Sequence, residues 1–189
     1  MKNRKWIVTV ILLIAVLAAA SILYPELSAR YGAHAEEEAD VRPWGDAPDF
    51  FVTDKDGNTV YLSDGYGKPA VVNFWATWCP YCVQELPVFE QYYKLYGDRV
   101  NFMIIDLTDG YRETKQVADA YIAKYGYTFP VYYDDSFSAS DSYGIYNIPV
   151  TMFIDAEGNF ASGYIGVLNE AAFRLEIERL LRPALEDNK

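Results

Sequence analysis

The sequence predicts an α/β domain with a mixed β-sheet flanked by helices, preceded by one transmembrane helix. Three observations support this prediction. A long apolar run lies near the N-terminus, short β-prone runs alternate with segments of helical period, and the last two β-prone runs flank a turn. The chain has 189 residues, of which 51% are hydrophobic and 23% charged, as in ordinary globular proteins.

The apolar run from Trp6 to Leu23 contains no charged residue. As a helix that rises about 1.5 Å per residue it reaches about 27 Å, close to the hydrocarbon thickness of a bilayer. It follows three basic residues, Lys2, Arg4 and Lys5. Basic flanks stay in the cytoplasm, so residues 1–23 are predicted to be a signal-anchor in the cell membrane, with the C-terminal domain on the extracytoplasmic side. A cleaved signal peptide is the alternative, because Ala18 and Ala20 fit the small-residue cleavage pattern.

Residues 24–45 are predicted to be an acidic linker. They contain few branched apolar residues and four clustered acids, Glu36, Glu37, Glu38 and Asp40. Such a segment cannot bury enough apolar surface to offset the entropy lost on ordering. The single histidine of the sequence, His34, lies in this linker, so we assign it no catalytic role.

Composition excludes several functions for the remaining domain, residues 46–189. The formal net charge is −11, which argues against nucleic-acid binding because phosphate contacts need a concentrated basic surface. With two cysteines and no histidine, the domain offers no His-rich metal site and no Ser/His couple. Its stability must come from an apolar core rather than from many disulfides.

The domain begins with a predicted hairpin and a central strand. The β-prone runs 50–53 and 59–62 flank the turn-forming residues DKDGN. Residues 70–75 form a continuous apolar run, as expected for a strand covered on both faces. Residues 80–96 then have the helical period, and Pro80 suits the first helical position.

An inserted strand and helix follow, and a hairpin and a helix close the chain. Residues 100–106 predict a second buried strand, and residues 111–125 predict a helix. Three further elements are predicted: a short strand at 129–133, a short helix at 136–143, and a last helix capped by Asn169 with an apolar stripe. Before that last helix, the runs 150–155 and 159–165 flank the turn AEG and predict an antiparallel pair.

Cys79 and Cys82 flank Pro80-Tyr81 where the buried strand turns into the helix. At a helix N-terminus, Cys79 faces unpaired backbone N–H groups and the positive end of the dipole, which favour its reactive thiolate. Cys82 lies one turn further in and is predicted to be more buried and less acidic. A structural disulfide across two residues would restrict the unfolded chain very little, and a zinc site would lack two ligands. The pair therefore indicates redox chemistry.

Two segments resemble the thioredoxin superfamily: FWATWCPYC at 74–82 resembles its active-site segment, and IPVT at 148–151 resembles its cis-proline loop. The anchor, the N-terminal hairpin and the inserted βα element resemble the TlpA/ResA branch of membrane-anchored thiol-disulfide oxidoreductases. The resemblance implies a thioredoxin-like fold and a protein-disulfide reductase that acts on exported proteins such as apocytochrome c. It also implies a transmembrane thiol reductase as electron donor, and no cofactor or metal beyond the redox-active pair.

The resemblance also singles out Asn73 and Glu85. Asn73 stands where thioredoxin has a buried aspartate, and Glu85 matches a glutamate that the branch carries near its active site. A neutral Asn73 cannot accept the proton that leaves Cys82, so Glu85, on the same helix face as Cys82, is the candidate catalytic proton acceptor. The alternative is a solvated surface glutamate. Pro87 is expected to kink this helix.

Five residues are expected to contact the substrate: Trp78, Pro80, Tyr81, Ile148 and Pro149. A cis Ile148–Pro149 bond would place Ile148 beside Cys79 with a backbone edge that can pair with an extended substrate segment. Trp78 is expected to shape the contact surface, with a packing role as the alternative.

Three other functions stay open. Pro80-Tyr81 departs from the Glu-Pro or Val-Pro common in the branch and resembles the pair of glutaredoxin, which leaves a disulfide oxidase or isomerase as an alternative. A copper metallochaperone of related fold uses paired cysteines with a distal histidine, which this domain lacks. A peroxidase places its catalytic cysteine in a different local setting, without so close a partner.

Overall fold

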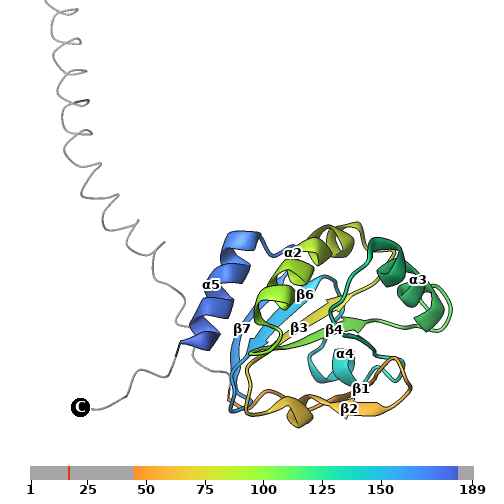
Figure 1. Ribbon diagram of the computed structural model, residues 1–189, viewed down its shortest axis with the longest axis horizontal. Coiled ribbons are helices and arrows are strands. Elements are labelled where there is room, and N and C mark those ends of the chain that lie inside the picture. Colours follow the sequence, from red (N-terminus) through yellow and green to blue (C-terminus); the bar gives the residue numbers. More distant parts are fainter. Residues whose placement is uncertain (1–16, 18–44, 183–189) are drawn as a thin grey trace, which may run out of the picture. The chain divides into compact units, whose positions relative to one another are not determined.

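The computed structural model describes Leu17 and residues 45–182 (Figure 1). The predicted signal-anchor at 1–23, apart from Leu17, and the predicted linker at 24–45, apart from Gly45, lie outside the described residues. Among the residues that are described, no helix is both long and apolar enough to cross a membrane. The anchor and the linker therefore stay predictions.

Seven strands form one mixed sheet in the order β2-β1-β5-β4-β3-β6-β7. Their bounds are β1 Phe51–Thr53, β2 Thr59–Tyr61, β3 Ala70–Trp75, β4 Asn101–Asp106, β5 Val131–Tyr133, β6 Val150–Ile154 and β7 Phe160–Ile165. Strand β4 pairs in parallel with β3 and β5, and the other pairs are antiparallel. The β1–β2 hairpin forms one edge of the sheet and β7 forms the other. The predicted mixed α/β fold is confirmed.

Helices cover both faces of this sheet. Their bounds are η1 Leu62–Gly65, α2 Pro80–Tyr96, α3 Lys115–Tyr125, α4 Ser138–Ser142 and α5 Glu170–Leu181. Side chains of α2, α3 and α5 belong to one buried apolar cluster, and side chains of η1 and α4 belong to another. Figure 1 shows α2 and α5 side by side, where the rings of Phe89 and Phe173 meet with their centroids 4.8 Å apart.

The central strand β3 determines where the site forms. Its side chains alternate between the two clusters, with Val71 and Trp75 in one and Val72 and Phe74 in the other, so the strand is buried on both faces as predicted. Strands β3 and β4 run in parallel, with Trp75 opposite Asp106 at their carboxyl ends. The segments that follow the two strands therefore begin at the same edge of the sheet.

Helix α3 begins later than predicted, at Lys115 instead of residue 111. Thr114 is its N-cap, and the Thr114 hydroxyl accepts a hydrogen bond from the N–H of Val117 across 3.3 Å. The residues before the cap are instead held in a turn by the side chain of Asp109. Side-chain hydrogen bonds to the backbone compete with helix formation, which explains the late start.

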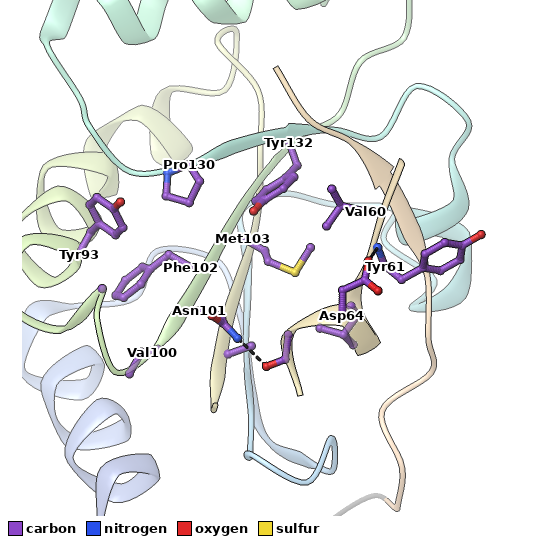
Figure 2. Close-up of a pocket in the computed structure, with 14 residues that line it drawn as sticks. Val60, Tyr61, Asp64, Tyr93, Val100, Asn101, Phe102, Met103, Pro130 and Tyr132 are labelled. Atoms are coloured by element: carbon purple, nitrogen blue, oxygen red, sulfur yellow. Dashed lines mark hydrogen bonds between the residues drawn. The ribbon is translucent and has the colours of Figure 1, made fainter. Parts of the chain in front are cut away.

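A cavity of about 270 Å³ lies at the other end of β4 (Figure 2). Its lining includes Tyr132 and Asn101, and the side-chain amide of Asn101 donates a hydrogen bond to the carbonyl oxygen of Gly65 across 2.7 Å. Asn101 is the first residue of β4 and Asp106 the last. The cavity therefore opens toward the amino-terminal end of β4, whereas β3 leads into α2 at the opposite end of the strands.

Candidate active site

Cys79 and Cys82 form a disulfide at the start of α2, with an S–S distance of 2.12 Å and 5.2 Å between their Cα atoms. Cys79 is the N-cap of the helix, and its sulfur accepts a hydrogen bond from the backbone N–H of Cys82 across 3.1 Å. Cys79 is 4% exposed and Cys82 is fully buried. The structure therefore contains the oxidised pair, with the burial order that the sequence predicts.

The Ile148–Pro149 peptide bond is cis. The carbonyl oxygen of Ile148 lies 3.7 Å from the sulfur of Cys79. The carbonyl oxygen of Pro149 accepts a hydrogen bond from the N–H of Gly166 across 2.8 Å, which links this loop to the end of β7. The sequence could not determine the isomer, and the structure places Ile148 beside Cys79, as expected for the cis form.

The residues around Cys79 on the α2 side are exposed. Trp78 and Tyr81 expose 40% and 64% of their surface, and Pro80 is also exposed. The guanidinium carbon of Arg112 lies 4.1 Å from the centroid of the Trp78 ring. A nearly buried sulfur thus lies among exposed aromatic side chains, which suit contacts with a polypeptide.

Glu85 follows Cys82 by one helical turn and is 2% exposed, so the alternative of a solvated surface glutamate is wrong. Its carboxylate accepts hydrogen bonds from the side-chain amide of Asn73 across 2.9 Å and from the N–H of Leu168 across 3.1 Å. Burial raises the pKa of Glu85 to about 7, although both hydrogen bonds oppose the rise. A carboxyl group with this pKa can take up and release a proton near neutral pH.

Comparison with known proteins places this geometry in a family. Residues 45–162 match the family model described as AhpC/TSA. The chain belongs to the AhpC/TSA family. It is 30% identical to the thiol-disulfide oxidoreductase ResA of Bacillus subtilis (strain 168), over 96% of this chain and 96% of that protein.

Solved structures of similar proteins share the fold. One is a thiol:disulfide interchange protein of the thioredoxin family from Chlorobium tepidum TLS, with a TM-score of 0.62 and 31% identity over 76% of this chain and 99% of that one. Another is the pneumococcal exposed lipoprotein thioredoxin Etrx1 from Streptococcus pneumoniae strain TIGR4, with a TM-score of 0.61 and 28% identity over 70% of this chain and 99% of that one.

This AhpC/TSA protein is a thiol-disulfide oxidoreductase of the ResA type, and Cys79 and Cys82 form its CxxC pair. The resemblance to the thioredoxin superfamily and the thiol-disulfide oxidoreductase activity that it implies are confirmed. Within Leu17 and residues 45–182, no group of three or more His, Cys, Asp or Glu side chains is arranged to hold a metal ion.

A second group of buried carboxyls, not predicted from the sequence, lies at the same sheet edge. Asp106, the last residue of β4, and Glu113 are both fully buried. Thr77, two residues before Cys79, donates its backbone N–H and its hydroxyl to Glu113 across 3.2 and 2.8 Å. One signal was available, because Asp106 ends an otherwise uncharged strand beside the strand that leads to the cysteines. Nothing local in the sequence links Glu113 to Thr77.

Proposed function

We propose that this AhpC/TSA protein reduces disulfides in exported proteins, such as apocytochrome c, on the extracytoplasmic side of the cell membrane. The position of the Cys79 sulfur carries the proposal. The sulfur lies at the N-terminus of α2, where it accepts a hydrogen bond from the N–H of Cys82 and lies beside the carbonyl oxygen of Ile148. The relative named ResA supports the reaction, and the relative described as an exposed lipoprotein thioredoxin supports the compartment.

In the first step, Cys79 of the reduced protein is the nucleophile. The helix N-terminus and the N–H of Cys82 favour the anionic, reactive form of the Cys79 sulfur. The thiolate attacks one sulfur of the substrate disulfide and forms a mixed disulfide. The other substrate sulfur leaves as a thiolate.

In the second step, Cys82 resolves the mixed disulfide. Its thiol gives a proton to Glu85, and the resulting thiolate attacks the sulfur of Cys79 and releases the second substrate thiolate. Two electrons have then passed from the dithiol to the substrate. Glu85 suits this role because it is buried with a pKa of about 7, and Asn73 holds its carboxylate through a hydrogen bond of 2.9 Å.

The substrate is a polypeptide that contacts the exposed residues around Cys79. Trp78, Pro80 and Tyr81 supply apolar surface on one side of the sulfur. Ile148 supplies a backbone edge on the other side, where an extended segment can pair, and the buried cis Pro149 sets the direction of that edge.

The N-terminal segments and the electron supply complete the proposal. Residues 1–23 act as a signal-anchor and residues 24–45 as a linker, which together keep the domain at 46–189 near the membrane and raise its effective concentration there. A transmembrane thiol reductase returns the pair to the dithiol state. The exchange needs no cofactor.

Pro80 and Tyr81 favour a second candidate, a disulfide oxidase or isomerase, because the residues between the cysteines tune the reduction potential. The potential can be measured by equilibration with glutathione buffers. A value near that of thioredoxin, about −270 mV, supports the reductase, whereas a value near that of DsbA, about −120 mV, supports the oxidase.

Insulin reduction by the full-length chain tests the proposed roles of the cysteines. Cys79→Ser is expected to abolish activity. Cys82→Ser is expected to accumulate a mixed disulfide through Cys79, because the attacking sulfur remains and the resolving sulfur is missing. The opposite result, with a mixed disulfide trapped only in Cys79→Ser, would show that the order of attack is wrong.

A further inference from the structure

Residues 107–114 form the loop between β4 and α3, which the two proposed steps do not use. The oxygen Oδ1 of Asp109 accepts hydrogen bonds from the backbone N–H groups of Tyr111, Arg112 and Glu113 across 2.7, 2.7 and 2.9 Å. One exposed carboxylate thus holds three successive backbone groups. These hydrogen bonds fix the backbone conformation of the loop and therefore the directions in which the side chains of Arg112 and Glu113 point.

Two consecutive residues of this loop contact the two residues that precede the nucleophile. Oε2 of Glu113 accepts the N–H and the hydroxyl of Thr77 across 3.2 and 2.8 Å. The guanidinium of Arg112 lies over the ring of Trp78, at 4.1 Å from the centroid. Because Thr77 and Trp78 lead directly into Cys79, the loop holds the segment that carries both the sulfur and an exposed aromatic side chain.

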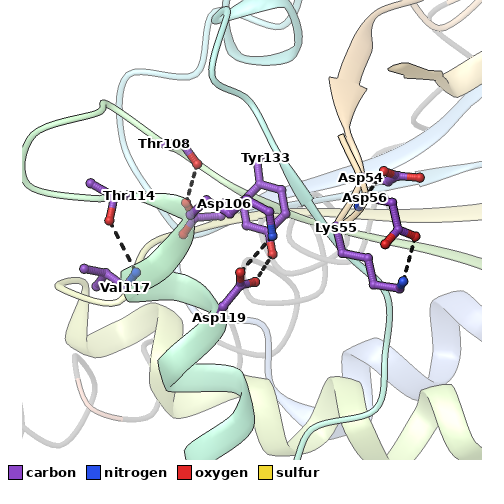
Figure 3. Close-up of polar contacts among 10 residues, drawn as sticks. Asp54, Lys55, Asp56, Asp106, Thr108, Thr114, Val117, Asp119 and Tyr133 are labelled. Carbon is purple, nitrogen blue, oxygen red and sulfur yellow. Dashed lines mark hydrogen bonds and ion pairs between the residues drawn. The ribbon is translucent and has the colours of Figure 1, made fainter. Parts of the chain in front are cut away.

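Glu113 has a second buried carboxyl as a neighbour. Oδ1 of Asp106 accepts the hydroxyl of Thr108 across 2.7 Å (Figure 3). Oδ2 of Asp106 and Oε1 of Glu113 have no hydrogen-bond partner among the described residues, although the two side chains interact. Two ionised carboxylates cannot form a hydrogen bond with each other, because each is only a hydrogen-bond acceptor. One proton between them supplies the missing donor for both oxygens.

We propose that Glu113 is a positioning residue for the thiol-disulfide exchange: it holds Thr77 and Trp78 in the conformation that binds the protein substrate, and a proton shared with Asp106 keeps it in place. The inference rests on the proposed function, because it uses Trp78 as a substrate contact. When the pair releases this proton to solvent, two buried like charges face each other and displace Glu113 from Thr77. Substrate binding then weakens, whereas the reactivity of Cys79 is unchanged.

The groups that face the pair determine the pH at which this happens. Burial raises the pKa of Asp106 to about 8, the hydrogen bond from Thr108 opposes the rise, and the negative charges of Glu113 and Asp109 add to it. Tyr133 of β5 also faces Asp106, but burial and Asp119 raise the pKa of its hydroxyl, so it stays neutral. Asp106 therefore holds its proton at neutral pH and loses it above about pH 8.

A similar contact away from the cysteines provides a matched control. Glu90 of α2 accepts the N–H and the hydroxyl of Thr128 across 2.7 and 2.8 Å. The neighbour of Glu90 is a cation, Lys94, at 2.8 Å, rather than a second carboxyl. The contact between Glu90 and Thr128 therefore needs no shared proton.

The test compares full-length wild type with Asp106→Asn, Glu113→Ala and Glu90→Ala. Insulin reduction is followed from about pH 6 to about pH 9.5 to separate KM from kcat, and iodoacetamide alkylation of Cys79 reports its reactivity without a protein substrate. Asparagine at position 106 donates an N–H to Glu113 at every pH and so mimics the protonated Asp106. Alanine at position 113 removes the acceptor for Thr77.

The wild-type KM for insulin is expected to rise about tenfold above pH 8 relative to that of Asp106→Asn. Glu113→Ala is expected to raise KM about tenfold at every pH, with less than about a threefold change in kcat and an unchanged alkylation rate. Glu90→Ala is expected to keep the wild-type KM profile. If Glu113→Ala fails to fold, the pH dependence of KM in Asp106→Asn tests the inference by itself.

Two results would overturn the inference: an Asp106→Asn profile that follows the wild type, or a Glu113→Ala variant that loses alkylation rate and kcat while KM stays constant. If the wild type reduces insulin and either of these results is found, the positioning role of Glu113 is wrong and the proposed function stands. A wild type that fails to reduce insulin contradicts the proposed function, and the inference with it.

Discussion

Helix α2 buries two glutamates five residues apart, and their surroundings differ. Glu85 accepts hydrogen bonds from two neutral donors, Asn73 and the backbone of Leu168, and burial raises its pKa to about 7. Glu90 is also buried, but it forms an ion pair with Lys94 at 2.8 Å. Burial again opposes ionisation there, yet Lys94 and further hydrogen bonds lower the pKa of Glu90 below its usual value.

The difference separates two uses of a buried carboxyl on one helix. A cation beside the carboxylate offsets the cost of desolvation and keeps Glu90 ionised at neutral pH, where it ties α2 to the loop at Thr128. Neutral donors offset this cost only in part, so Glu85, one turn from Cys82, can gain and lose a proton near pH 7. The first turns of α2 therefore supply a proton acceptor near the disulfide, Glu85, whereas Glu90 further along the helix has a structural role.

The largest expected effect is on the pH dependence of stability. The rise in the pKa of Glu85 from 4.5 to about 7 corresponds to about 3 kcal/mol that is fully present below pH 4.5 and lost as the pH rises to 7. The lowered pKa of Glu90 has the opposite sign, since its contribution is present above pH 4.5 and lost in acid. Urea unfolding of wild type, Glu85→Gln and Glu90→Gln at several pH values measures these two contributions to the free energy of unfolding. A wild-type advantage over Glu85→Gln that is independent of pH would contradict this assignment.

The next effect is kinetic. Glu85→Gln is expected to slow the resolution of the mixed disulfide about 100-fold at neutral pH, because glutamine cannot accept the proton of Cys82. The rate should recover at alkaline pH, where the Cys82 thiol ionises without an acceptor. Glu90→Gln should leave the rate unchanged. Stopped-flow measurement of substrate release tests this comparison, and equal rates in the two variants would remove Glu85 from the mechanism.

The smallest effect concerns the cation. Lys94 is 61% exposed in its side chain, so Lys94→Met is expected to cost less than about 1 kcal/mol of unfolding free energy. The same change should raise the pKa of Glu90, because the ion pair that favours the carboxylate is lost. Carboxyl carbon chemical shifts during an NMR titration report this pKa. An unchanged value would show that the hydrogen bonds from Thr128 and Phe129 are sufficient.

Local patterns were enough to predict the cysteine site. The pair Cys79 and Cys82, the strand before it and the helix after it occupy one continuous stretch, and the predicted burial order follows from their positions in the first helical turn. The start of α3 was predicted four residues too early because the turn made by Asp109 depends on side-chain geometry that hydrophobic periodicity does not record.

The sequence by itself determined the order of strands and helices, the redox pair at the start of α2 and the proton acceptor candidate one turn later, because each depends on residues close together in the chain. Only the tertiary structure decided which carboxyls are buried and which groups from distant segments contact them. It brought Leu168 to Glu85 and Glu113 to Thr77, contacts that span 83 and 36 residues of sequence. Packing of the sheet and its helices makes such contacts, and it sets the desolvation and the neighbouring charges that determine a pKa.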